Sequence, residues 1–145
     1  MRMDLMTLSL LMVAGTPALA MAQGCSEAEA LLRAEATQLE PILTQMTSIN
    51  NEYSIKQKLI SDEYDYFYYY YGTKPDTSPG TYVGNLESEK LSLEQSYNAL
   101  REKAGPIDER LLGQIKVYEA ACAPYARTDA LLNEYKIVRN TPRGE

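Results

Sequence analysis

The side chains that could do chemistry in this chain are mainly phenols and carboxylates. Its 145 residues include twelve tyrosines and twenty acids but no histidine. This excludes His-based triads, His metal ligands and imidazole proton shuttles. The serines have no lysine at a spacing that would make a dyad, and no glycine-rich phosphate loop occurs. We therefore expect a protein that is not an enzyme and that needs no cofactor.

Acidic residues cluster twice, at Asp62, Glu63 and Asp65 and again at Glu87 and Glu89. Neither spacing matches an ordered calcium loop, and such runs are typical of a solvated face. Nothing marks a pair of acids that face each other across a cleft, as carboxylate-only hydrolysis requires. We expect no metal site.

A run of tyrosines before the main turn is the unusual feature of the chain. Six of the twelve tyrosines lie within eight residues: Tyr64, Tyr66, Tyr68, Tyr69, Tyr70 and Tyr71. On a helix these side chains would surround the whole circumference, which a two-helix hairpin cannot bury. Exposed tyrosines offer contact area together with a hydrogen-bonding end. These six residues are the candidate site for a protein partner or, as the alternative, for a glycan or apolar ligand that stacks on the rings.

Two other interpretations of this run stay open. In the first, the tyrosines have a structural role and pack against their own turn, whose apolar residues are Pro75, Pro79, Tyr82 and Val83. In the second, residues 64–71 and 81–83 pair as a short β-hairpin, because tyrosine and phenylalanine favour strands.

The first 22 residues predict a signal peptide. An apolar run over residues 5–15 is too short for a comfortable membrane span, and a proline and small residues follow it. Cleavage after Ala22 is preferred, with cleavage after Ala20 or an uncleaved anchor as alternatives. We expect an extracytoplasmic protein, periplasmic or secreted, with no membrane insertion once the leader is removed.

Cys25 and Cys122 are the two cysteines of the chain. An even pair in an exported protein predicts a disulfide, and the lack of a Cys-x-x-Cys motif predicts a structural one. The alternative is a lipid on Cys25, which would leave Cys122 without a partner.

The net charge of −6 narrows the choice of partner. Basic residues are scattered singly, so nucleic acid and anionic lipid surfaces are disfavoured as partners. We expect a non-catalytic interaction or structural protein that meets a protein of the cell envelope or extracellular space, or a second copy of itself.

Apolar residues recurring at intervals of seven predict the long helices that would carry these groups. The first helix should begin at Ser26, where Ser26–Glu29 makes a capping box. Its repeat runs through Leu32, Leu39, Met46, Tyr53, Ile60 and Phe67. The phase survives Pro41, which favours one kinked helix over two unrelated helices.

Residues 72–85 hold three glycines and two prolines and form the main turn region. The second repeat follows through Leu86, Leu93, Leu100 and Ile107. Gly105–Pro106 should interrupt the second helix, and Thr128–Asp129 should cap a last helix that runs to about Val138.

These patterns predict an all-α protein with a single helical domain over residues 23–138 and a flexible tail over 139–145. The favoured architecture is a long antiparallel helical hairpin, coiled-coil-like, whose open end is stapled by the disulfide. The rival is a small three- or four-helix bundle that folds back at Pro41 or at Gly105–Pro106.

Overall fold

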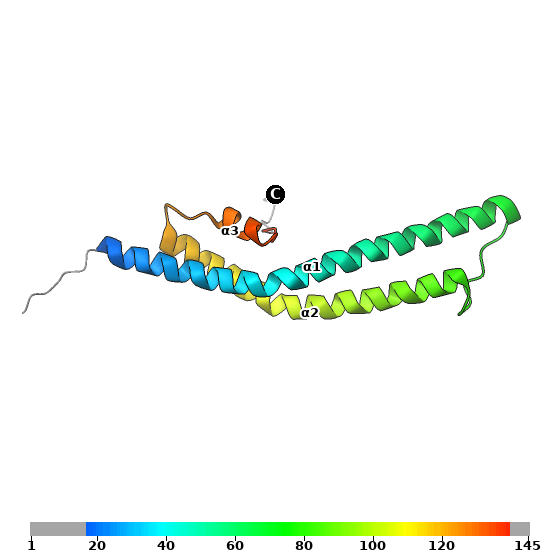
Figure 1. Ribbon diagram of the computed structural model, residues 1–145, viewed down its shortest axis with the longest axis horizontal. Helices are drawn as coiled ribbons and strands as arrows, with labels where there is room; N and C mark the ends of the chain where they lie inside the picture. Colours follow the sequence, from blue (N-terminus) through cyan, green and yellow to red (C-terminus); the bar gives the residue numbers. More distant parts are fainter. Residues whose placement is uncertain (1–16, 140–145) are drawn as a thin grey trace, which may run out of the picture.

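The fold is a long helical hairpin with a short third helix. A computed structural model describes residues 17–139, with side chains described from Gly24 onward. Its elements are α1 (Pro17–Tyr71), α2 (Tyr82–Cys122) and α3 (Thr128–Glu134). α1 and α2 run antiparallel, and α3 folds back over their open end (Figure 1). Residues 17–139 contain no strand, so the all-α prediction is confirmed.

The predicted repeat forms the seam between α1 and α2. Leu32, Leu39 and Ile60 share one position of the seven-residue repeat, and all three are buried. The phase is therefore kept through Pro41, which lies inside α1 and is exposed. Only one backbone bond is lost at such a proline, so one continuous helix forms there as expected.

Two helix boundaries differ from the prediction. α1 begins at Pro17 rather than at Ser26, because proline is accepted in a first turn and the alanine-rich residues 18–22 favour a helix. α2 is continuous through Gly105–Pro106, where both residues are exposed and water can satisfy the freed carbonyl group. The predicted interruption is wrong, and the chain folds back neither there nor at Pro41. Residues 1–16 of the expected signal peptide lie outside the described residues.

The turn is shorter than predicted, because α2 already starts at Tyr82. The Thr81 hydroxyl caps the helix by accepting a hydrogen bond from the Gly84 amide at 3.2 Å. The loop therefore spans residues 72–81 rather than 72–85.

The last helix also ends early, at Glu134 rather than near Val138. Lys136 has a φ of 54°. Its amide and that of Ile137 donate back to the carbonyls of Asn133 and Leu132, both at 3.0 Å. This left-handed cap stops the helix and turns Ile137 into the core.

The buried residues form two separate clusters. The larger lies at the open end, where Leu32, Leu39, Leu111 and Leu132 join all three helices. The smaller lies near the turn and consists of Ile60, Val83 and Leu86, with Tyr64 packed against it. Between the two clusters, residues 40–59 of α1 and 87–103 of α2 are all exposed or half-buried.

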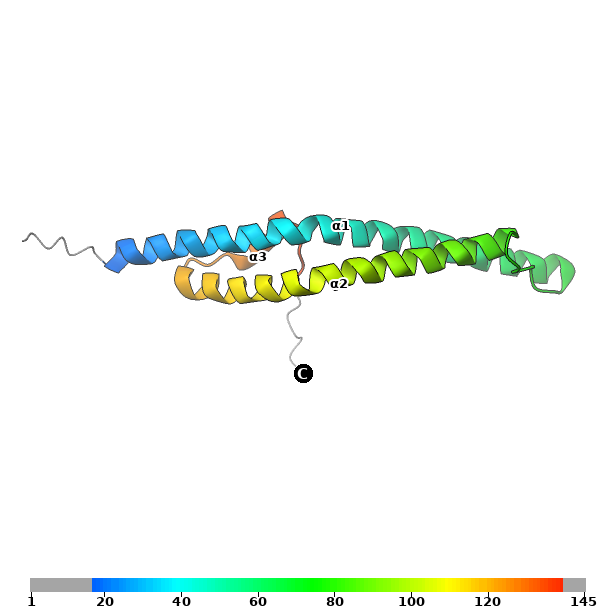
Figure 2. The same ribbon diagram turned by 90° about the horizontal axis from the view of Figure 1, so that it is seen from below.

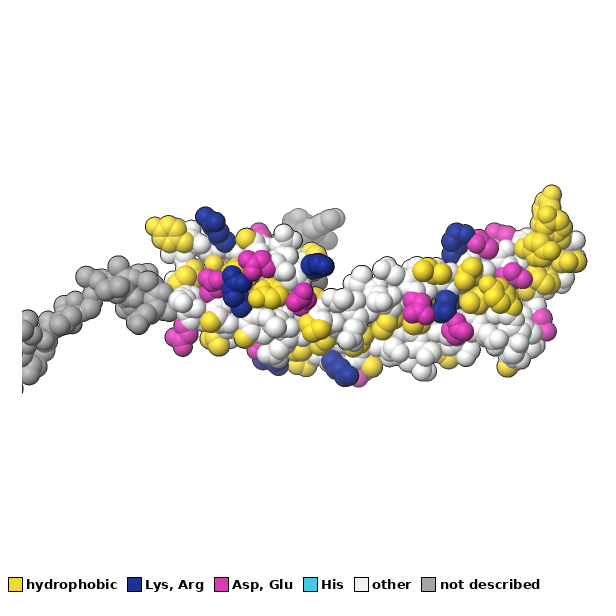
Figure 3. Space-filling model, in the orientation of Figure 1, with side chains coloured by type: hydrophobic (Ala, Val, Ile, Leu, Met, Phe, Trp, Pro, Cys, Tyr) yellow, Lys and Arg dark blue, Asp and Glu magenta, His cyan; other side chains and the backbone are white. Residues whose placement is uncertain are grey.

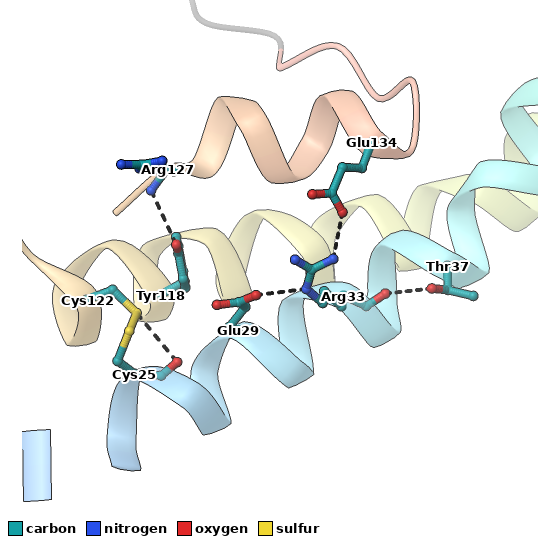
Figure 4. A network of polar contacts seen from close by, with 8 residues as sticks. All are labelled: Cys25, Glu29, Arg33, Thr37, Tyr118, Cys122, Arg127 and Glu134. Carbon is teal, nitrogen blue, oxygen red and sulfur yellow. Dashed lines mark hydrogen bonds and ion pairs between the residues drawn. A yellow bond between two sulfur atoms is a disulfide. The ribbon is translucent and has the colours of Figure 1, made fainter. Parts of the chain in front are cut away.

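Cys25 and Cys122 form the predicted disulfide, with their Cα atoms 4.8 Å apart, at the open end of the hairpin. Polar contacts beside it hold α3 (Figure 4): Arg33 bridges Glu29 and Glu134, and the Tyr118 hydroxyl accepts from the Arg127 amide at 3.2 Å. Arg139 pairs with Glu119 at 2.9 Å, and the rest of the expected tail lies outside the described residues. None of the helices between residues 17 and 139 has an apolar stretch long enough to cross a membrane.

Candidate interaction surface at the hairpin tip

The end of α1 projects past the start of α2. The ion pairs Glu35–Arg110 and Lys56–Glu89 set the register of the two helices. Continued along the hairpin, this register places Tyr82, the first residue of α2, opposite residue 63 of α1. Residues 64–71 thus form an overhang, which Figure 2 shows reaching beyond α2. The predicted tyrosine site lies entirely on this overhang.

Five of the six candidate tyrosines have exposed side chains. The exposed fractions are 47% for Tyr66, 49% for Tyr68, 82% for Tyr69, 64% for Tyr70 and 62% for Tyr71. Tyr64 is the exception, because it packs against the cluster of Ile60, Val83 and Leu86. The structure therefore places the six residues together but gives Tyr64 a packing role.

The aromatic rings of the overhang contact one another. Tyr70 lies between Tyr66 and Tyr69, with ring centroids 4.7 and 4.8 Å away. Tyr71 lies 5.3 Å from Phe67. Figure 3 shows hydrophobic side chains gathered at this end of the molecule, where they protrude as a convex tip. Such ring contacts limit side-chain freedom before any partner arrives, which lowers the entropic cost of binding.

One phenol of the tip, that of Tyr66, is held in its protonated form. A hydrogen bond between the side chains of Tyr66 and Tyr71 raises the pKa of Tyr66 above its ordinary value of 10.0. This phenol is therefore neutral at physiological pH, and its one proton is engaged by Tyr71.

The nearby acids form surface ion pairs. Asp62 pairs with Lys58 at 2.5 Å, and Glu89 pairs with Lys56 across the hairpin. Glu87 lies 3.7 Å from Lys90. Within the described chain, no group of three His, Cys, Asp or Glu side chains is arranged to hold a metal ion.

Of the two other interpretations of the tyrosine run, the structure contradicts the β-hairpin and agrees with packing under the turn for some of the residues. The β-hairpin is wrong, because residues 64–71 are helical and residues 82–83 belong to α2. Helix propagation from the long α1 outweighs the local strand preference of the aromatics. Packing under the turn applies to Tyr64, which lies against Val83. Of the apolar residues of the turn, Pro75 and Val83 are buried, whereas Pro79 and Tyr82 are exposed.

One feature that the sequence did not single out lies midway along the hairpin. A hollow of about 310 Å³ opens between the helices there. It is lined by Ile49, Asn50, Tyr53, Leu93, Glu94, Tyr97 and Asn98. The seven-residue repeat assigns the apolar lining residues to the seam between the helices. It does not predict that these side chains are only half-buried.

Comparison with known proteins adds no assignment to this surface. No protein-family model, curated protein or solved structure matches the chain.

Proposed function

We propose that the protein is a non-catalytic interaction protein of the extracytoplasmic space and that the tyrosine tip is its contact surface. The tyrosine tip is defined as Tyr66, Tyr68, Tyr69, Tyr70 and Tyr71. The observation that carries the proposal is the overhang, because it leaves these five rings exposed at the end of a rigid helix. Large exposed aromatic patches are rare on proteins that contact nothing.

The location rests on two features of the chain. The apolar leader and its small-residue cleavage motif indicate export, and an intramolecular disulfide persists in oxidising compartments. The stapled hairpin would then be a rigid spacer that holds the tyrosine tip away from its other end.

The convex shape of the tip favours a protein partner over a small ligand. Ligand sites are concave and surround most of the bound molecule, whereas flat or convex aromatic surfaces are typical of protein interfaces. The glycan or apolar-ligand alternative would require the exposed rings to close around a guest.

The test is recovery of a partner from the envelope fraction of the native host. The bait is the disulfide-bonded chain, compared with a Tyr66→Ser, Tyr69→Ser, Tyr70→Ser triple variant. We expect the triple variant to keep the helical signal in circular dichroism and to lose the partner. Tyr125→Ser is the matched control, because Tyr125 is 83% exposed at the opposite end of the hairpin.

Two results would contradict the proposal. Equal recovery by the wild type and the triple variant would show that the tip makes no contact. Loss of the helical signal in the triple variant would show that the exposed rings support the fold instead.

A further inference from the structure

The hollow midway along the hairpin lies in the part of the seam that has no buried side chain. Its volume of about 310 Å³ falls within the range of small-molecule pockets, about 300–1,000 Å³. Residues 40–59 of α1 and 87–103 of α2 are all exposed or half-buried at this level. Leu39 and Ile60, the nearest buried residues of α1 on either side, belong to the two clusters that hold the helices together. The hollow is therefore flanked by packed seam at both ends.

The floor of the hollow is apolar and aromatic. It consists of the four lining residues that are half-buried: Ile49, Tyr53, Leu93 and Tyr97. The register of the hairpin places Ile49 near the level of Tyr97 and Tyr53 near the level of Leu93. One aliphatic and one aromatic side chain thus face each other at two successive levels. Such a floor suits the apolar body of a small molecule.

The rim of the hollow is polar. Its three lining residues, Asn50, Glu94 and Asn98, are all exposed. Glu94 and Asn98 lie one turn apart on the same side of α2, and Asn50 lies opposite them on α1. Between residues 24 and 139, none of these three side chains hydrogen-bonds or pairs with another residue. Their acceptor groups are therefore available to a ligand that enters the hollow.

Glu94 is the one formal charge among the residues that line the hollow. Lys90, one turn earlier on α2, does not neutralise it, because its ammonium group pairs with Glu87 at 3.7 Å. The same ammonium group lies 5.1 Å from the centroid of the Tyr53 ring. One aromatic ring of the floor thus already carries a cation, whereas Tyr97 and the Glu94 carboxylate remain for another. An aromatic face combined with a carboxylate is a chemical environment that attracts organic cations.

We propose that this hollow binds a small primary amine in its protonated form, carried on an apolar body. The body packs on the floor, and the ammonium group lies at the rim near Tyr97. There it donates hydrogen bonds to the Glu94 carboxylate and to the side-chain oxygens of Asn50 and Asn98. The net charge of −6 also favours the approach of a cation. The site is separate from the tyrosine tip and does not rest on the proposed function.

The test compares three probes that share one apolar body and differ in the head group. Phenethylammonium, phenethyl alcohol and hydrocinnamate are titrated into the full disulfide-bonded chain at about 0.15 M salt, which screens distant charges. Amide NMR spectra follow the binding, and the side-chain amides of Asn50 and Asn98 report on the rim. We expect phenethylammonium to bind on the order of tenfold more tightly than the alcohol. Hydrocinnamate should bind least, because Glu94 repels its carboxylate.

Two variants test the roles of the lining residues. Glu94→Gln keeps the size of the side chain and should remove most of the preference for the ammonium over the alcohol. Tyr97→Leu keeps the seam position apolar and should reduce that preference by about threefold. Glu102→Gln is the matched control, because Glu102 is an exposed acid about two turns further along α2 and does not line the hollow. It should bind all three probes like the wild type.

Four outcomes would overturn this site. They are no binding of phenethylammonium, equal binding of the three probes, equal weakening by Glu94→Gln and Glu102→Gln, and spectral changes that map to residues 66–71 instead of the rim. Each would leave the interaction proposed for the tyrosine tip to its own test, because the triple tyrosine variant changes no residue that lines the hollow.

Discussion

The guanidinium group of Arg33 lies 2.6 Å from the carboxylate of Glu134, a residue 101 positions further along the chain. The same guanidinium bonds Glu29 at 2.9 Å, so one side chain of α1 joins its own helix to α3 (Figure 4). α3 has seven residues, too few for a stable isolated helix. Its position therefore depends on this bridge and on the burial of Leu131 and Leu132.

Replacing Arg33 by methionine should loosen α3 without unfolding the hairpin. The apolar stem is kept but both ion pairs are lost, so amide hydrogen exchange over residues 128–137 should become faster while residues 53–67 stay unchanged. Arg101→Met, at an exposed position of α2, is the control and should leave exchange in α3 unaltered. Unchanged exchange in Arg33→Met would mean that apolar packing alone holds α3.

Removing the disulfide should lower the free energy of unfolding. It closes a span of 97 residues, for which the loop-entropy model gives at most about 4 to 5 kcal/mol. Urea denaturation of a Cys25→Ala, Cys122→Ala variant measures this loss, and a reducing agent should shift the wild type to the same midpoint. The reducing agent should not affect the variant, and equal midpoints for the oxidised wild type and the variant would refute the stabilising role.

A methyl group at Gly84 should disturb the turn. Its Cβ would lie 2.1 Å from the carbonyl oxygen of Ser78, so the loop would have to move away from α2. We expect Gly84→Ala to lower the free energy of unfolding by about 1–3 kcal/mol. Gly113→Ala is the matched control in the same helix, because nothing lies within 4 Å of its added Cβ. It should stabilise the protein by about 0.5–1 kcal/mol in the same denaturation experiment.

The turn should loosen at low pH. The hydroxyl and amide groups of Ser78 both hydrogen-bond the Asp76 carboxylate, and these bonds lower the pKa of Asp76 below its ordinary value of 3.8. The folded turn thus favours the ionised form, so this contribution is complete above about pH 4 and is lost as the pH falls through the lowered pKa. Following the Asp76 carboxyl carbon and the Ser78 amide by NMR should show one shared transition below pH 3.8. Asp76→Asn keeps an acceptor that does not titrate, so its Ser78 amide should show no such transition.

Much of the fold follows from spacing along the chain. The seven-residue interval between Leu32 and Leu39 places both side chains on one face of a helix whatever surrounds it, and both are buried in the seam. The pairing of Cys25 with Cys122 follows from an even cysteine count in an exported sequence. Local signals were less reliable where tertiary packing opposes them. Gly105–Pro106 predicts a helix boundary, yet α2 is continuous there because the seam on either side of it is packed against α1.

At the tyrosine tip, too, some features follow from the sequence and others from the tertiary structure. By itself, the sequence determined that six tyrosines are clustered and that they cannot all be buried on a two-helix hairpin, because helical periodicity distributes them around the axis. Only the tertiary structure decided that α1 overhangs α2, that Tyr64 is the residue packed inward, and that α3 lies over the open end of the hairpin. A repeat specifies which side chains share a face. How far one helix reaches past another depends instead on contacts between residues remote in sequence, such as Lys56 with Glu89 and Arg33 with Glu134.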